Sequence, residues 1–179
     1  MKKVKINYLG TEFQINEKAY HTTDWNGNKI SPKIVISHVI GASMIKQFIK
    51  KYYPTLKVWS VSESFSMGNS IDVYITTKDI SKVSDEIYNK IEDFAKSLKM
   101  GYWNSMEDMY EYNKRDKKTD NGFQIDSYCK WISVMNKPKF GTIEWGIDRM
   151  KRTGETLNDL ISYVDKNKQE KFRELALTL

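Results

Sequence analysis

The sequence has one cysteine and two histidines among its 179 residues, and each scarcity excludes a class of site. A single thiol, Cys129, cannot form a disulfide within the chain, so the cytoplasm is the expected location. The histidines, His21 and His38, lie far apart in the sequence and match no metal-ligand spacing such as His-x-x-x-His. We expect surface or structural roles for both and no metal or other cofactor.

Long apolar runs and nucleotide-binding motifs are also missing. No stretch approaches the roughly 18 apolar residues that span a bilayer. The start of the chain, Met1–Lys5, does not open the apolar region of a signal peptide. Neither Gly-x-x-x-x-Gly-Lys nor Gly-x-Gly-x-x-Gly occurs, so no phosphate-binding loop is predicted. With no recognisable catalytic constellation, we do not expect an enzyme.

The composition is that of a folded, basic protein. Hydrophobic residues make up 40% and aromatic residues 13% of the chain, which favours a packed core over disorder. The formal charge of +6 is the sum of +3 for residues 1–42, −1 for 43–112 and +4 for 113–179. The basic excess therefore lies toward both ends, and it permits binding to nucleic acid or to an acidic partner.

Two helical stripes flank a hairpin in the middle of the chain. Apolar residues recur at helical spacing from 39 to 53, and Pro54 ends that helix. A second stripe steps by three and four from Ile80 to Leu98, with Asp79 or Ser81 as its cap. Residues 56–63 and 71–76 read as two strands around a loop in which Gly68 or Asn69 takes positive φ. The predicted core includes Phe48, Ile75, Ile87 and Phe94.

The flanking segments predict further strands and helices. Residues 4–15 indicate a strand pair or one bent strand, and 19–24 with 29–36 indicate a hairpin whose second strand, with Pro32, lies at an edge. One strand is predicted over 123–134, and helices over 142–150 and 157–175 with Gly154 between them. The N-terminal strands extend the sheet of the central hairpin in this interpretation.

Together these patterns predict an α+β fold. Helices pack on one face of an antiparallel β-sheet in two layers, followed by a C-terminal helical extension. The expected division is an α+β domain over residues 1–145, with its helix-hairpin-helix unit at 39–100, and the extension over 146–179.

The segment 102–112 combines four aromatic residues with three carboxylates. It either lines a pocket or forms a short helix or loop that places Trp103, Met106 and Tyr110 in the core. Glu107, Asp108 and Glu111 would suit a magnesium or calcium ion if the segment is helical, because Glu107 and Glu111 are then one turn apart. A solvated acidic face is the alternative.

Cys129 also has two interpretations: a nucleophile if a histidine lies near it, or a small buried apolar residue.

Basic residues form three candidate contact regions for nucleic acid or another partner. In the first, lysines stand beside aromatic residues, which is the combination that single strands bind. The other two are the polar loop at 113–122 and the cluster Arg149, Lys151 and Arg152, which begins in the helix predicted over 142–150 and continues just beyond it. The candidate residues are Lys46, Lys50, Lys51, Lys57, Trp59, Lys114, Arg115, Lys117, Lys118, Arg149, Lys151 and Arg152.

Residues 42–112 carry a family resemblance. The segments Ile45–Pro54, Leu56–Val61, Gly68–Tyr74 and Trp103–Asp108 resemble the large polyvalent protein-associated domains of phages and conjugative elements, in particular the one numbered twenty-nine. The chain departs from that family at Thr77-Lys78-Asp79, which lacks the glycine or proline of a tight turn. The resemblance implies a mobile-element setting and supplies no catalytic residue.

The expected function is therefore that of a non-enzymatic accessory protein from a phage or other mobile element. It would bind a macromolecule, either nucleic acid or a host protein or nucleoprotein complex, such as a component of host defence. The alternative is a metal-dependent enzyme that acts on phosphodiesters through Glu107, Asp108 and Glu111.

Overall fold

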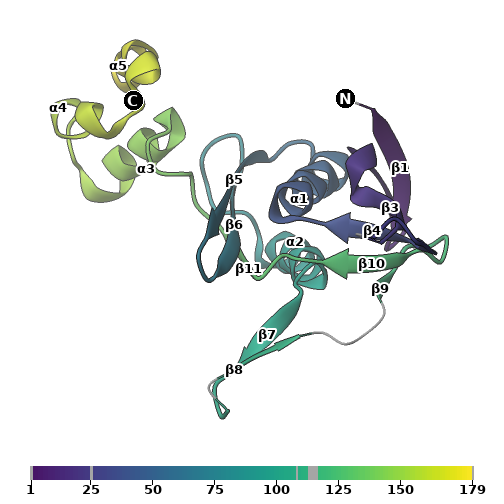
Figure 1. The fold of residues 1–179 in the computed structure, drawn as a ribbon. Coiled ribbons are helices and arrows are strands. Elements are labelled where there is room, and N and C mark those ends of the chain that lie inside the picture. Colours follow the sequence, from purple (N-terminus) through teal and green to yellow (C-terminus); the bar gives the residue numbers. More distant parts are fainter. Residues whose placement is uncertain (1, 25, 108, 113–116, 179) are drawn as a thin grey trace.

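The computed structural model describes residues 2–24, 26–107, 109–112 and 117–178 of the chain. Helices and strands contribute in similar measure, and the fold belongs to the α+β class (Figure 1). No helix in these ranges is long and apolar enough to cross a membrane.

The N-terminal half builds two β-structures. β1 (Lys3–Tyr8) and β2 (Thr11–Asn16) form an antiparallel pair around the turn at Leu9 and Gly10, so the strand pair predicted over 4–15 is confirmed. A short 3-10 helix, η1 (Glu17–Ala19), leads into β3 (Tyr20–Thr23), which pairs with β4 (Lys29–Ile36) as the predicted hairpin.

β4 is not an edge strand, which corrects the prediction made from Pro32. The sheet order is β3-β4-β10-β9, with β10 (Gln124–Ser127) parallel to β4 and β9 (Lys117–Lys118) beyond it. The parallel ladder takes up only residues 33–36 of β4, and the register with β3 shifts between His21 and Thr23. Pro32 therefore lies outside the ladder that would need its missing N–H.

The centre of the molecule is a three-stranded sheet in the order β11-β6-β5. β5 (Lys57–Phe65) and β6 (Gly68–Thr76) are the predicted hairpin, and Gly68 has a φ of +145° as expected for its turn. β11 (Trp131–Met135) joins β6 in parallel. The N-terminal strands belong to other sheets and do not extend this one, contrary to the prediction.

The segment predicted as one strand over 123–134 is two strands in two sheets. β10 pairs with β4, and after residues 128–130 the chain continues as β11 beside β6 (Figure 1). Cys129 lies at this crossing, where it is fully buried. A Cβ on Gly41 would come within 2.7 Å of its sulfur, so the absence of a side chain on Gly41 permits α1 to approach the crossing closely.

α1 and α2 cover one face of the central sheet. α1 (His38–Tyr52) begins at the Ser37 cap and stops before Pro54, close to the predicted bounds. α2 (Asp85–Ser97) begins later than its stripe indicated. Of the predicted core, Ile75 and Phe94 are buried, while Phe48 and Ile87 are half-buried against the same cluster. Phe48 stacks on Phe94 with ring centroids 4.2 Å apart.

The start of the second stripe was assigned wrongly. Ile80 has a φ of +70° and sits in a turn, where Asp79 accepts hydrogen bonds from the hydroxyls of Thr77 and Ser81. Neither Asp79 nor Ser81 caps α2, whose N-cap is Ser84. Ile80 packs instead against the C-terminal helices.

The segment 102–112 is a hairpin, β7 (Gly101–Asn104) with β8 (Met109–Tyr112), and not a helix. It projects from the body in Figure 1. Met106 lies at its tip and is 95% exposed, so the core role considered for this residue is wrong. Tyr110 does turn inward onto Trp131. Asp108 and the side chain of Trp103 lie outside the described part of the structure.

The C-terminal helices form a second, smaller apolar cluster. α3 (Ile143–Thr153) runs three residues beyond the predicted end at residue 150, and Gly154, predicted to lie between the two helices, ends it in the left-handed conformation. The helix predicted over 157–175 is divided into α4 (Leu157–Leu160), η2 (Ile161–Tyr163), η3 (Lys166–Lys168) and α5 (Gln169–Ala176). These elements bury Ile147, Leu160, Val164 and Phe172. The expected boundary between residues 145 and 146 falls inside α3, and the division into two domains stays a prediction.

Candidate functional site

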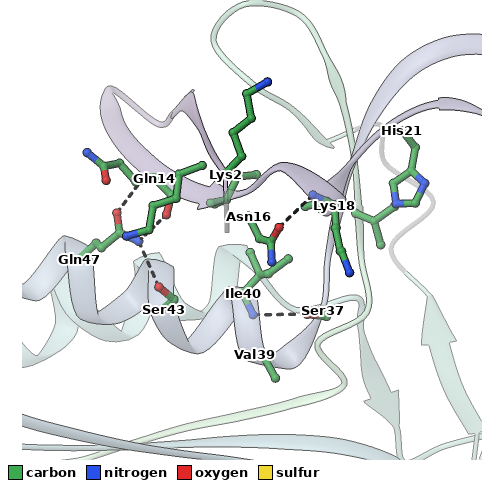
Figure 2. A pocket seen from close by; sticks show the side chains of 14 residues that line it. Lys2, Gln14, Asn16, Lys18, His21, Ser37, Val39, Ile40, Ser43 and Gln47 are labelled. Carbon is green, nitrogen blue, oxygen red and sulfur yellow. Dashed lines mark hydrogen bonds between the residues drawn. The ribbon is translucent and has the colours of Figure 1, made fainter.

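An open pocket of about 690 Å³ lies beside the N-terminal half of α1 (Figure 2). β2, β4, η1 and the first residues of the chain form its other walls. Its apolar lining is aliphatic and comes from Ile15, Ala19, Val35, Val39 and Ile40. Its basic lining comes from Lys2, Lys3, Lys18 and His21. A cavity of this size accommodates a small ligand or one segment of a larger partner.

The side-chain amide of Gln47 links two walls of the pocket, α1 and β2, through hydrogen bonds. Gln47 on α1 accepts a hydrogen bond from the backbone N–H of Gln14 at 2.9 Å and donates to the carbonyl of Gln14 at 3.0 Å. The same amide donates to the hydroxyl of Ser43 at 3.1 Å (Figure 2). These bonds fix α1 against β2, so the pocket is a preformed feature of the fold.

The electrostatics of the pocket favour an anion. It lies at the N-terminal end of α1, where the helix dipole is positive, and the first turn of α1 contains no acidic residue. Lys2 pairs with Glu17 at 3.3 Å, but within the described residues no carboxylate pairs with Lys3 or Lys18. The pocket therefore combines an aliphatic lining with a basic rim.

Two of the predicted contact residues, Lys46 and Lys50, lie on the same face of α1 as the residues that line the pocket. Lys46 follows Val39 by seven residues and Lys50 follows Ser43 by seven, which is two helical turns in each case. These lysines therefore lie on the helix face that borders the pocket, and no described carboxylate pairs with either. We call Lys3, Lys18, Lys46 and Lys50 the α1 basic face.

The other residues of the first predicted region lie on opposite sides of the central sheet. Val58 opposes Ile75 on the face toward α1, so its neighbours Lys57 and Trp59 point to the other face. Lys57 pairs there with Glu144 at 3.0 Å. Lys51 stays on α1, with its ammonium 5.2 Å from the ring centre of Tyr52. The predicted grouping of α1 lysines with Trp59 does not form.

The second predicted region contains a structural lysine. Lys117 is half-buried, and its ammonium donates to the carbonyl of Ser97 at 2.6 Å and to that of Lys99. Burial lowers the pKa of Lys117 below its ordinary value. Lys118 is exposed. Lys114 and Arg115 lie outside the described residues.

In the third region the arginines already have carboxylate partners. Arg149 donates twice to Glu155, at 2.6 and 2.9 Å, and this hydrogen-bonded pair raises the pKa of Arg149 and lowers that of Glu155. Arg152 pairs with Asp148 at 2.8 Å. Lys151 is exposed without a described ion pair. Of the three predicted residues in this region, only Lys151 has no ion pair among the described residues.

The carboxylates considered for a metal are not arranged as predicted. Glu107 is exposed in the hairpin turn, whereas Glu111, on β8, accepts hydrogen bonds from Tyr102 and Asn104. The helical spacing on which the prediction rested is absent because the segment is a hairpin. Nowhere in the described ranges do three His, Cys, Asp or Glu side chains come together as metal ligands would.

Cys129 is the small buried residue that one interpretation expected. Burial raises the pKa of its thiol to about 11, partly offset by a hydrogen bond with Ser127 and by the charge of Lys117. A thiol with this pKa is almost entirely protonated at neutral pH and is a poor nucleophile.

Sequence reasoning missed Lys2, Lys3, Lys18 and His21 as members of a site. The only available signal was the charge of +3 over residues 1–42. Nothing in their spacing shows that β1, η1 and β3 bring them to the start of α1.

No family model, curated protein or solved structure matches this chain in comparisons with known proteins. The resemblance of residues 42–112 to the mobile-element domains stays a prediction.

Proposed function

We propose that this chain is a non-enzymatic accessory protein of a phage or other mobile element that binds nucleic acid through the α1 basic face. One observation carries the proposal: four lysines without described carboxylate partners border the same helix. The family resemblance of residues 42–112 supports the mobile-element setting. Arginines and lysines elsewhere that form ion pairs contribute less, because an ion pair must break before it can bind phosphate.

The interaction that fits this face is with the phosphate backbone. α1 is 15 residues long and spans about 22 Å, so its lysines and those of the pocket can contact several phosphates in succession. No Phe, Tyr or Trp lines the pocket, and only the His21 ring offers a surface for base stacking there, so stacking should contribute little. Binding should therefore depend weakly on sequence and strongly on salt.

A gel-shift titration with single- and double-stranded DNA and RNA at two salt concentrations tests the proposal. Four phosphate contacts predict a log–log salt slope of about −3 to −4. Replacing Lys3, Lys18, Lys46 and Lys50 together by Ala should weaken binding roughly tenfold or more and flatten this slope.

The matched control replaces four lysines that form ion pairs, Lys5, Lys90, Lys96 and Lys168, by Ala. It removes the same formal charge and should retain most of the affinity. Equal losses in the two variants would show that net charge matters and the α1 basic face does not. If the wild type binds no DNA or RNA at micromolar concentration and low salt, a host protein becomes the favoured partner.

A further inference from the structure

The β7–β8 hairpin has the opposite character to the rest of the molecule. Residues 101–112 contain three carboxylates and no lysine or arginine, in a chain whose net charge is +6. Four of its large side chains, Tyr102, Met106, Met109 and Tyr112, are more than half exposed. Tyr102 and Met109 lie on one face of the hairpin and Tyr112 on the other, with Met106 in the turn between the strands. So many exposed apolar side chains on one small projecting element mark an interaction element.

Contacts at the base of the hairpin hold its shape. A Cβ on Gly101 would lie 2.0 Å from the carbonyl oxygen of Glu111, so only glycine permits this close strand pairing. Tyr110 donates to the carbonyl of Lys130 at 3.0 Å and packs against Trp131. In the turn, the N–H of Met106 donates to the side chain of Asn104. The tip is thus presented on a preformed element, which reduces the entropic cost of binding.

The pocket beside α1 is complementary to this tip. Its aliphatic lining offers a place for a flexible apolar side chain such as Met106. Lys3 and Lys18, which pair with no carboxylate among the described residues, offer partners for Glu107. A phosphate backbone would contact the same lysines but would leave the aliphatic lining unused.

We propose that the hairpin tip of one copy, with Met106 and Glu107, docks into the pocket of a second copy. Within one chain the contact is impossible, because the hairpin projects away from β1, β2 and the start of α1 (Figure 1). The interface is head-to-tail, so copies add in chains or rings instead of forming a symmetric dimer. A contact this small gives weak association, on the order of 100 μM.

This inference goes beyond the proposed function and shares two lysines with it. A docked hairpin covers Lys3 and Lys18, so self-association and nucleic-acid binding exclude one another at the pocket. The hairpin therefore acts as an intermolecular competitor of nucleic acid at high protein concentration.

Sedimentation equilibrium of the full chain, without nucleic acid, tests the contact directly. The average mass of the wild type should rise with concentration over a roughly hundredfold range around the expected dissociation constant. The double variants Met106→Ser/Glu107→Ser and Lys3→Glu/Lys18→Glu should each associate at least about tenfold more weakly. Both change exposed side chains, and circular dichroism verifies that they fold.

Mixing the two variants gives the decisive measurement. One retains an intact pocket and the other an intact hairpin, so the mixture should form a one-to-one complex that neither forms alone and that does not grow further. The control Leu177→Ser/Glu174→Ser, on an exposed part of α5 and its end, should associate like the wild type.

A wild type that stays monomeric throughout, or a mixture that forms no complex, overturns the proposal. Failure of the proposed function would be seen separately, as a lack of gel shift. If both proposals hold, Met106→Ser/Glu107→Ser binds nucleic acid at least as tightly as the wild type, because it retains every lysine.

Discussion

Lys46 and Lys50 on α1 and Lys117 on β9 carry the same charge and have opposite surroundings. Lys46 and Lys50 lie two helical turns beyond Val39 and Ser43 of the pocket wall, on the same face of α1, and have no described carboxylate partner. Lys117 extends into the body, where it donates to two backbone carbonyls and where burial lowers its pKa. The first two are available to a ligand, whereas the third satisfies acceptors that the fold leaves at the end of α2.

Formal charge is therefore a poor guide to where an anion binds. The strongest basic excess in the sequence lies over residues 113–179, yet its described cations include Lys117 with its carbonyls and two arginines with their carboxylates. The smaller excess at the N-terminus supplies the pocket. What matters is which charges the fold leaves without a partner.

Replacing Lys117 should have the largest effect on stability, and it tests directly whether this lysine is structural. Lys117→Ala removes the donor from two carbonyls in a half-buried place, so we expect the free energy of unfolding to fall by about 1–3 kcal/mol. Urea denaturation measures this change. The neighbouring Lys118→Ala, which removes an exposed charge, is the control and should differ little from the wild type. Equal stabilities of the two variants would show that Lys117 is not structural.

The contacts of Lys117 also limit what a combined variant of the second predicted region can show. If Lys117 and Lys118 are replaced together, a loss of nucleic-acid binding is confounded by lost stability, because Lys117 donates to two backbone carbonyls.

The parts of the fold that sequence predicted well are those with local signals. The stripe of α1 with Pro54, the turn at Gly68 and the end of α3 at Gly154 depend on residues within a few positions of one another. The crossing at Cys129 was missed because the alternation of residues 123–134 continues through it. Only the pairing partners, β4 for one half and β6 for the other, distinguish two strands from one.

The candidate site was harder to predict for the same reason. Lys46 and Lys50 were identified because they stand beside apolar and aromatic residues on one helix. Lys3 and Lys18 join them only through the pairing of β1 with β2 and the fastening of β2 to α1 by Gln47. Such contacts between distant segments leave no periodic trace in a single sequence.

Cys129 provides a second test, with a smaller expected effect, of how burial changes the ionisation of groups in the body of the protein. Its thiol has an ordinary pKa of 9.0, which burial raises to about 11 in the folded protein. Because the folded pKa is the higher one, the stabilising contribution is complete below pH 9 and is lost as the pH rises toward 11.

We expect a loss of roughly 1–2 kcal/mol over that window relative to Cys129→Ala. Urea denaturation of both proteins at pH 8 and pH 10.5 measures the difference in slope. Lys117, whose pKa is lowered by burial, acts in the opposite direction in both proteins, so the comparison with the variant isolates the thiol together with its coupling to Lys117. Parallel pH profiles for the two proteins would contradict the raised pKa.

The smallest expected effect on stability comes from a comparison of two double variants, one on α3 and one on α1. Arg149→Ala/Arg152→Ala and Lys46→Ala/Lys50→Ala each remove two positive charges. The first pair breaks the half-buried pair of Arg149 with Glu155 and the more exposed pair of Arg152 with Asp148. Surface ion pairs contribute little to stability, so the denaturation midpoint should fall only modestly. The second pair should leave the midpoint unchanged.

Nucleic-acid affinity should show the reverse order. A guanidinium that already forms two hydrogen bonds to a carboxylate would have to break both before it contacted phosphate, so the α3 variant should bind like the wild type. The α1 variant should bind more weakly, with a salt slope smaller in magnitude by about 2, because two phosphate contacts are lost. Gel shifts at two salt concentrations decide between the regions. If the α3 variant lost as much affinity as the α1 variant, the arginines would have to exchange carboxylate for phosphate on binding, and the binding surface would extend to the C-terminal helices.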